Sequence, residues 1–392
     1  MLKWMIIGGG VQGCTLAIWL LRHHKAAAED IVIIDPHETP LSIWERCTSV
    51  IQMPYLRSPS IHHLDVPPFA LEHFAKTSYG RSLGGFRPPY DRPYIDLFNE
   101  HCRHLMDELG LKQRWVRGRA VDLTKEHGAW TCALEDGTVL RSKRAALAIG
   151  ISEAPYWPQW ANPLRDTLDV RHVFECERAE QLDELSGPII VIGGGISAAH
   201  TCIRLSDQYP GQVTLLTRHP LRIHQFDSDP GWLGPKYMKP FSSIQDARVR
   251  REQIRAARHR GSMPLELKTN LVRRMKEGKL HITIDEVKEA LPRTSRGIKL
   301  KLESGALAEC QTLLLATGFC QDPPGMNWLT TCAERYQLPR AECGYPLPLP
   351  HSLEWDQGLH VTGALAELEL GPTARNISGA RRGAERIIAS LH

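Results

Sequence analysis

The chain opens with a short apolar run that is followed by a glycine-rich turn and then by further apolar stretches. Residues 4–7 are Trp-Met-Ile-Ile, residues 15–21 are mostly apolar, and residues 31–34 are Ile-Val-Ile-Ile. A short β-branched run predicts a buried parallel strand, and the stretch between the two runs predicts a helix. The first 35 residues therefore predict a strand, a turn, a helix and a second strand, the beginning of a βαβ arrangement.

The same order of elements occurs a second time, near the middle of the chain. Residues 189–192 are Ile-Ile-Val-Ile, a glycine-rich turn and a helical stretch follow, and residues 213–217 form the next apolar run. After each unit an alternating segment enters a turn, at Asp136-Gly137 and at Ser304-Gly305. Each segment predicts a hairpin that returns to a buried parallel strand, at residues 145–149 and 313–316.

This repetition predicts an α/β fold with two Rossmann-like dinucleotide-binding domains, the second inserted into the first. A chain of 392 residues is also too long for one ordinary core. Prolines at 155, 158 and 163 mark where the chain leaves the first domain for the inserted one, and Pro323-Pro324-Gly325 marks where it returns to the first domain. We expect residues 1–160 to form the first part of one domain, residues 161–322 the inserted domain, and residues 323–392 the rest of the first domain.

The first glycine-rich turn predicts a dinucleotide site. Gly8, Gly10 and Gly13 have G-x-G-x-x-G spacing directly after the first strand, and the second strand ends at Asp35. The glycines permit a tight turn, a close approach of backbone N–H groups to a pyrophosphate, and packing of helix on strand, while Asp35 accepts from a ribose hydroxyl. The alternative is a glycine-rich loop between unrelated elements.

The second turn carries a different signal at the end of its second strand. Gly193, Gly195 and Ala198 stand at the three turn positions, but the strand at 213–217 is followed by Arg218, with Arg222 nearby. An arginine there suits a 2′-phosphate, whereas an acid suits the free hydroxyl of NAD. We therefore expect the first site to bind FAD and the second to bind NADPH. The alternative for the second site is that Arg218 is an ordinary surface arginine.

The C-terminal segment adds elements that a complete NADPH domain does not need. It contains an apolar strand, Gly363, and a helix expected to begin near Pro372-Thr373. Proline is favourable in a first helical turn, and free N–H groups there suit an electron-rich flavin ring. We expect Gly363, Pro372 and Thr373 to close over the flavin; the alternative is a plain C-terminal helix.

Composition narrows the function classes. The net charge of +4 is small for this length and predicts no nucleic-acid partner, and no stretch is apolar for long enough to span a membrane. Ten cysteines occur without a C-x-x-C pair, which argues against a redox disulfide and a cysteine-rich zinc site. We expect a cytoplasmic protein, and a homo-oligomer is possible.

The order of these motifs resembles that of the class B flavoprotein monooxygenases, and within them the lysine and ornithine N-hydroxylases of siderophore pathways. The stretch "VIGGGISAAH" resembles their NADPH motif, with Ser197 at the serine position, and Ala316-Thr317-Gly318-Phe319 resembles their A-T-G-Y/F motif. The resemblance implies a glutathione-reductase-like fold with FAD and NADPH as cofactors. Thr317, Gly318 and Val121 are further positions that we assign to the cofactors.

The resemblance also implies a reaction. In this class, FAD takes a hydride from NADPH, and a C4a-hydroperoxyflavin then transfers one oxygen atom to a nucleophilic nitrogen or sulfur of a small metabolite. Gln52 stands where the N-hydroxylases carry a glutamine on the flavin side, but Arg57-Ser58-Pro59 replaces their substrate-binding segment. Arg57 has the chemistry to hold a substrate carboxylate in bidentate fashion, or alternatively serves structure or an FAD phosphate.

Other candidates give weaker signals. His62-His63 lacks a third metal ligand at a useful spacing, and the role of His172 is open. Residues 248–260 carry six arginines on a predicted helix, which indicates a solvated face or one that attracts NADPH phosphates. Two other functions stay open: a flavin reductase or oxidase that passes electrons to a quinone, a protein or oxygen, and a nucleotide-binding protein without turnover.

Overall fold

The computed structural model describes residues 1–294 and 297–391. Its first sheet has eight strands, which come from the N-terminal and the C-terminal parts of the chain. Within it, β8 (Val139–Leu147), β1 (Leu2–Ile7), β2 (Ile31–Asp35) and β5 (Trp115–Arg117) run parallel in that spatial order, with β5 at one edge. β1 is buried between its neighbours because both faces of this part of the sheet are covered, as its continuous apolar run predicts.

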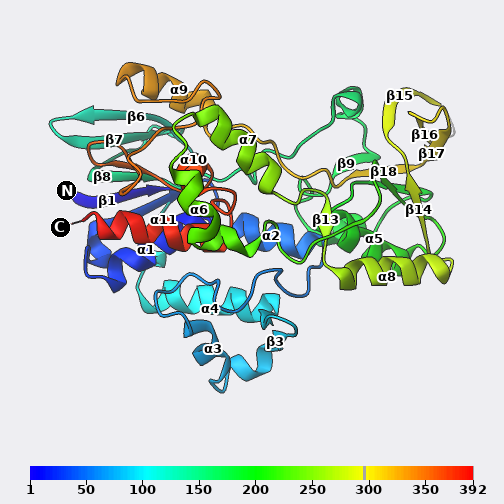
Figure 1. Ribbon diagram of the computed structural model, residues 1–392, viewed down its shortest axis with the longest axis horizontal. Helices are drawn as coiled ribbons and strands as arrows, with labels where there is room; N and C mark the ends of the chain where they lie inside the picture. Colours follow the sequence, from blue (N-terminus) through cyan, green and yellow to red (C-terminus); the bar gives the residue numbers. More distant parts are fainter. Residues whose placement is uncertain (295–296, 392) are drawn as a thin grey trace.

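The second sheet has five parallel strands and belongs to the inserted part of the chain. Its order is β14 (Leu280–Ile284), β11 (Val213–Thr217), β10 (Ile189–Ile192), β18 (Thr312–Leu315) and β9 (Val170–His172). The two sheets occupy opposite halves of the molecule (Figure 1). The predicted α/β fold with two Rossmann-like units is confirmed.

Both predicted hairpins are present, but they return differently. β6 (Ala120–Glu126) and β7 (Ala129–Leu134) pair antiparallel, and β7 continues into the long strand β8, which also pairs with β1. In the second half, β16 (Gly297–Leu302) pairs with β17 (Leu307–Cys310) and with β15 (Val287–Thr294). There β17 ends at Cys310, and the buried parallel strand β18 begins separately at Thr312.

The tail completes the first sheet. β20 (Leu359–Val361) pairs with β8 in parallel and with β19 (Glu354–Asp356) in antiparallel fashion. Helix α11 (Ile377–Ala389) lies beside α1 (Val11–Arg22), the helix that follows the first glycine turn (Figure 1). Residues from the two ends of the sequence therefore form the same side of one domain.

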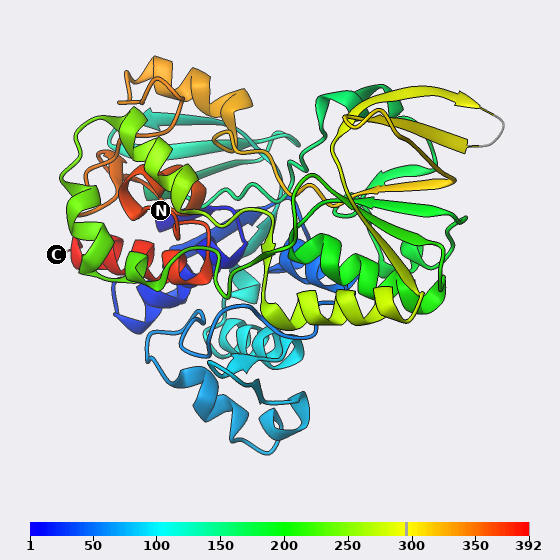
Figure 2. The same ribbon diagram turned by 45° about the vertical axis from the view of Figure 1, so that its right-hand side comes forward.

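Part of the inserted stretch packs on the first domain. Helices α6 (Pro235–Ser242) and α7 (Ala247–Ala257) lie beside α10 (Glu367–Leu370) and α11 in both views (Figures 1 and 2). Met238, Phe241 and Ile254 form one apolar cluster with Tyr345 and Leu368. The domain boundaries at 160 and 322 stay a prediction, and α6 and α7 form a bridge within the inserted stretch.

The remaining helices surround this frame. α5 (Ile196–Gln208) and α8 (Leu265–Lys276) pack together beside the second sheet. The half of the molecule that contains the first sheet also contains α2 (Ser42–Val50), α3 (Ala70–Ala75), α4 (Ile95–Glu108) and α9 (Met326–Arg335). Among residues 1–294 and 297–391, no helix has the length and apolar character required to cross a bilayer.

Candidate nucleotide sites and their junction

The first glycine turn connects β1 to α1 with little room for side chains. A Cβ on Gly13 would lie 1.9 Å from the Gly8 carbonyl oxygen, so helix and strand pack closely only without one. Gly8 itself has a φ of +110°, which favours glycine. At Gly10, by contrast, no atom lies within 4 Å of an added Cβ. The turn thus leaves open space at the position expected to face a pyrophosphate.

Asp35 lies against this turn. Its carboxylate accepts hydrogen bonds from the backbone N–H of Gly9 at 2.7 Å and of His37 at 2.9 Å. Burial raises the pKa of Asp35, and the bonds from Gly9 and His37 act in the opposite direction. The acid at the end of β2 is therefore held next to the turn at the end of β1, as a ribose-binding role requires.

The C-terminal segment lies beside the same turn. Gln12 Nε2 donates to the carbonyls of Ala374 at 3.1 Å and Asn376 at 3.3 Å, and a Cβ on Gly363 would lie 2.7 Å from the Gln12 side chain. The Thr373 hydroxyl is buried and has no hydrogen-bond partner among residues 1–294 and 297–391. The helix itself begins later than predicted, at Ile377, because residues 371–376 form an irregular turn before it.

The second turn repeats this geometry at the start of α5. A Cβ on Gly193 would lie 2.6 Å from the Ala316 carbonyl oxygen, whereas Gly195 has no atom closer than 3.7 Å. Ser197 lies in the first turn of α5 and Ala198 is fully buried. Arg218 follows β11 with a 71% exposed side chain, 3.7 Å from Glu286. Its guanidinium is accessible to a phosphate in solution.

Thr317 and Gly318 lie where the chain passes between the two halves. The Thr317 hydroxyl donates to the Tyr156 carbonyl, and the backbone N–H of Tyr156 donates to the Gly318 carbonyl at 2.8 Å. Pro155 and Phe319 form an isolated antiparallel bridge. The outgoing and returning crossings therefore run side by side.

Val121 lies at an irregularity of the first sheet. The register between β6 and β7 shifts between Ala120 and Asp122, so Val121 stands opposite no residue of β7. It is 41% exposed. This position is compatible with backbone contacts to a cofactor, and its assignment stays a prediction.

Gln52 and Arg57 occupy different environments. Gln52 is exposed just after α2 and has a φ of +49°. The Arg57 guanidinium donates to the carbonyls of His224, Gln225 and Phe226 and to the Ser262 hydroxyl, and it pairs with Asp227. Arg57 thus fastens the loop at 224–227. These contacts favour the structural role among the alternatives for Arg57, and its assignment to substrate binding stays a prediction.

Of the histidines that the sequence singled out, His63 and His172 are buried and His62 is half-buried. Burial lowers the pKa of His62, His63 and His172 to about 4. His63 bonds to the Pro68 carbonyl and to Asp65 N–H. In the part of the chain that the structure describes, no group of three or more potential metal ligands comes together.

The arginine run at 248–260 is not only a solvated face, and the prediction was wrong in this respect. Arg250 and Arg251 are buried, and the Arg258 side chain is 11% exposed. These side chains bond to Glu369 and Glu367 of α10. The available signal was periodicity, since Arg250 and Arg251 stand four and three residues before the apolar Ile254 on the same helix.

With the geometry in place, comparison with known proteins identifies the family. A model for L-lysine 6-monooxygenase/L-ornithine 5-monooxygenase matches residues 112–320, more than half of the chain, and an FAD-NAD(P)-binding model matches residues 5–152. The chain belongs to the L-lysine 6-monooxygenase/L-ornithine 5-monooxygenase family. It is a flavin monooxygenase that binds FAD and NAD(P), which confirms the resemblance seen in the sequence.

Solved structures show the same fold along the whole chain. Ornithine hydroxylase from Pseudomonas aeruginosa is 20% identical, with a TM-score of 0.76 over 99% of this chain and 98% of its own. Ornithine N-hydroxylase from Kutzneria sp. 744 is 13% identical, with 0.79 over 100% and 99%. The FAD-bound cadaverine monooxygenase from Erwinia amylovora is 17% identical, with 0.77 over 100% and 94%. None of the curated proteins compared with this enzyme matches it.

The residues present fit FAD in the first half of this family member. The open space at Gly10 lies at the N-terminus of α1, where backbone N–H groups favour a phosphate. The unpartnered hydroxyl of Thr373 lies beside Gln12 and the same turn, and a buried donor of this kind gains stability from a ligand acceptor.

Proposed function

We propose that this enzyme uses FAD and NADPH to oxygenate a nucleophilic nitrogen or sulfur of a small metabolite. Family membership supplies the reaction class. The assignment of the two glycine turns to FAD and NADPH, and the nature of the substrate atom, are our proposal. When bound, FAD supplies the redox chemistry: it accepts a hydride from NADPH and uses oxygen to oxygenate the substrate.

One observation carries this proposal, a continuous path of contacts between the two turns. On the FAD side, Gln12 bonds to Ala374, and Arg258 Nε donates to the Pro372 carbonyl at 3.1 Å. From Arg258 the backbone runs through His259 and Arg260 to Gly261.

On the other side, the path ends at the second turn. The Gly261 Cα lies 3.7 Å from the position of an added Cβ on Gly195. A nucleotide bound at each turn would therefore share a boundary formed by residues 258–261 and 372–374. Both nucleotides would therefore end at the same junction of the two halves, which is where hydride transfer needs the two rings to meet.

The chain's own residues have positioning tasks in this reaction. The N-termini of α1 and α5 hold pyrophosphates, Asp35 holds a ribose, and Arg218 holds the 2′-phosphate that distinguishes NADPH from NADH. A substrate amine attacks only as the neutral base, and a water-poor site lowers the amine pKa toward that form. No acid–base pair of the enzyme is required, because the cofactor performs the bond making.

Rapid-mixing absorbance tests the proposal. The FAD-loaded enzyme is reduced with NADPH without oxygen and is then mixed with oxygenated buffer. We expect a transient blue-shifted flavin band that decays slowly, and faster decay with a productive amine; L-ornithine and cadaverine are the first to test. Direct reoxidation without this band, with all electrons recovered as hydrogen peroxide, would instead support a reductase or oxidase.

A further inference from the structure

Three arginines converge on one buried glutamate beside the C-terminal segment at 371–376. The Glu367 side chain is fully buried. Its carboxylate accepts a hydrogen bond from Arg251, one from Arg258 at 2.8 Å and one from Arg375 at 2.7 Å. Because Arg251 and Arg258 come from the inserted stretch and Arg375 from the tail, this carboxylate joins the two parts of the chain.

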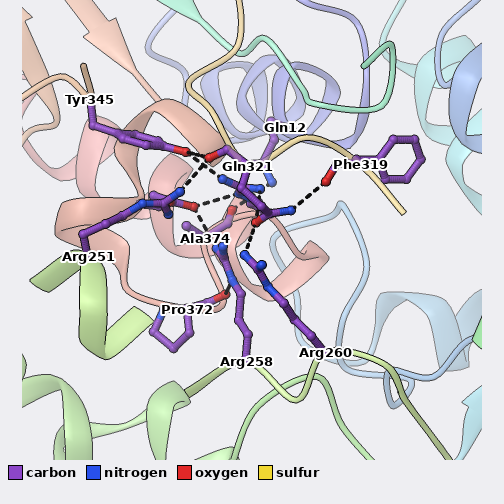
Figure 3. Close-up of polar contacts among 11 residues, drawn as sticks. Gln12, Arg251, Arg258, Arg260, Phe319, Gln321, Tyr345, Pro372 and Ala374 are labelled. Atoms are coloured by element: carbon purple, nitrogen blue, oxygen red, sulfur yellow. Dashed lines mark hydrogen bonds and ion pairs between the residues drawn. The ribbon is translucent and has the colours of Figure 1, made fainter. Parts of the chain in front are cut away.

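A fourth arginine is linked to this group through Gln321 (Figure 3). Gln321 Oε1 accepts from Arg260 at 2.6 Å and from Arg375 at 3.1 Å. The backbone carbonyl of Gln321 accepts from Arg251 at 2.6 Å and from the Tyr345 hydroxyl at 2.6 Å. We call Arg251, Arg258, Arg260 and Arg375 the arginine cluster. Its members are therefore joined by two residues, Glu367 and Gln321.

The arginine cluster has more positive charge than its carboxylate neutralises. Four guanidinium groups are bonded to Glu367 directly or through Gln321, and Asp322 acts on Arg375 electrostatically. Burial, and then the charges of Arg375 and Arg251, lower the pKa of Arg258 well below its usual value. Arginine nevertheless keeps its proton at neutral pH, so a net positive charge remains in the cluster.

Most of this charge is held away from water. The side chains of Arg251, Arg258 and Arg375 are at most 11% exposed. Arg258 Nη1 and Arg251 Nε are buried without a hydrogen-bond partner among the residues that the structure describes. Water and salt screen a buried charge less than an exposed one, so it acts more strongly on its surroundings.

The surroundings of the arginine cluster include the segment that we assign to the flavin, residues 371–376. Arg258 Nε donates to the Pro372 carbonyl at 3.1 Å, and Arg375 belongs to the segment itself. Gln12, which lies in the first glycine turn, donates to two carbonyls of the same segment. The segment is therefore bonded both to the first nucleotide turn and to the arginine cluster.

Reduction changes the charge of a flavin. A hydride brings one proton and two electrons, so the flavin ring gains one negative charge when it accepts a hydride. A positive charge held nearby stabilises the reduced ring relative to the oxidised ring and raises the reduction potential. The nucleotide phosphates have other donors, at the N-termini of α1 and α5 and at Arg218. The charge of the arginine cluster is thus available to the flavin.

We propose that the arginine cluster raises the reduction potential of the bound flavin, and that Glu367 is the positioning residue that sets the size of this effect. Glu367 holds Arg258 and Arg375 at the flavin segment and cancels part of their charge. The cluster thereby favours hydride transfer from NADPH. This inference rests on the proposed function, which assigns residues 371–376 to the flavin.

The reduction potential of the FAD-loaded enzyme tests the proposal without turnover. The flavin is reduced slowly without oxygen in the presence of a reference dye, and the absorbances of flavin and dye give the potential. Arg375→Gln removes one charge, and we expect it to shift the equilibrium about 10-fold toward the oxidised flavin. For a two-electron couple this is a decrease of about 30 mV.

A second variant at the same position separates charge from structure. Arg375→Lys keeps the positive charge but loses the planar guanidinium that bonds to Glu367, Gln321 and Tyr345. We expect its potential to stay close to that of the unaltered enzyme. Equal decreases in Arg375→Gln and Arg375→Lys would indicate a structural role alone and would overturn the proposal.

Removal of the carboxylate should have the opposite sign. Glu367→Gln uncovers positive charge, so in a folded, FAD-loaded variant we expect a shift of about 10-fold toward the reduced flavin. An unchanged or lowered potential there would contradict the role given to Glu367. Arg248→Gln, on α7 but paired at the surface with Glu342, is the control that keeps the potential. If Glu367→Gln does not fold, the two Arg375 variants decide the question.

Failure of the proposed function gives a different pattern. If the enzyme does not oxygenate a substrate, the potentials still shift as described, but no oxygenated product forms. If the flavin lies away from residues 371–376, neither Arg375→Gln nor Glu367→Gln moves its potential, and Asp35→Ala retains FAD. Unmoved potentials together with loss of FAD from Asp35→Ala would overturn the role of the arginine cluster alone.

Discussion

The Asp35 carboxylate accepts a hydrogen bond from the backbone N–H of Gly9 at 2.7 Å. This bond joins the acid at the end of β2 to the glycine turn at the end of β1, two elements that the sequence separates by a helix. It holds a carboxylate beside the open space at Gly10, where the FAD pyrophosphate and ribose are expected.

Removal of this carboxylate should weaken FAD binding. We expect Asp35→Ala to raise the Kd for FAD at least 10-fold, because both the ribose acceptor and the Gly9 contact are lost. Fluorescence titration of the apoprotein with FAD measures this. Asp30→Ala, which removes a surface carboxylate paired with Lys3, is the control, and an Asp35→Ala protein with unchanged flavin affinity would contradict the assignment.

Substitution of Gly10 and of Gly13 in the first turn should have two different effects. Gly10→Ala adds a Cβ into open space, so we expect a folded protein with an unchanged Tm that loses FAD because the pyrophosphate is displaced. Gly13→Ala forces a Cβ to 1.9 Å from the Gly8 carbonyl oxygen, so we expect a lower Tm as well. Thermal unfolding and flavin content together distinguish the cases; flavin retained by Gly10→Ala would disprove the contact.

Arg218 should control the choice between NADPH and NADH. We expect Arg218→Ala to raise the KM for NADPH about 10- to 100-fold and to leave that for NADH nearly unchanged, because only NADPH carries the 2′-phosphate. Its exposed contact with Glu286 contributes little to folding, so the Tm should not change. Steady-state reduction with both cofactors measures the preference, and a preference equal to that of the unaltered enzyme would refute the assignment.

Arg57 should act on stability more than on substrate affinity. Arg57→Lys keeps the charge but cannot reach the carbonyls of His224, Gln225 and Phe226 together, so we expect a loss of about 1–3 kcal/mol in unfolding free energy. Denaturant unfolding measures this, with the surface variant Arg87→Lys as a control. A raised substrate KM with unchanged stability would support the substrate-binding hypothesis instead.

Buried histidines should make the fold acid-sensitive. Burial lowers the pKa of His63 to about 4 and that of His101 to about 3, and the two rings lie 5.5 Å apart, edge to face. In the unfolded chain both titrate near 6.5, so between that pH and their folded pKa values the unfolded state binds more protons. Their contribution to stability is complete above pH 6.5 and is lost as the pH falls toward 4.

Substitution of one ring tests this sign. We expect His101→Gln to flatten the dependence of unfolding free energy on pH between 6.5 and 4, by on the order of 2 kcal/mol. His351→Gln, at an exposed turn position away from this pair, is the control and should leave the dependence unchanged. Denaturant unfolding at a series of pH values gives both slopes. Parallel profiles for the unaltered enzyme and His101→Gln would show that this ring does not contribute.

Local patterns were sufficient for the two Rossmann units and for the family. The apolar runs at 4–7 and 189–192 form buried parallel strands, and the glycine spacing after each is a local requirement of a strand-to-helix turn. The later start of α11 was not predictable in this way. Pro372 is compatible with a helix start by its local chemistry. The irregular turn found there instead is the segment whose Ala374 and Asn376 carbonyls accept hydrogen bonds from the distant Gln12.

The sequence by itself determined the strands, the turns and the order of the two nucleotide motifs, because these depend on residues that are close along the chain. Only the tertiary structure decided the partners of the charged side chains. Arg57 and Arg258 have the same chemistry, yet one fastens a loop and the other bonds to Glu367 at the junction of the nucleotide sites. The role of a guanidinium depends on which acceptors other segments bring to it, and those segments lie more than 100 residues away in the sequence.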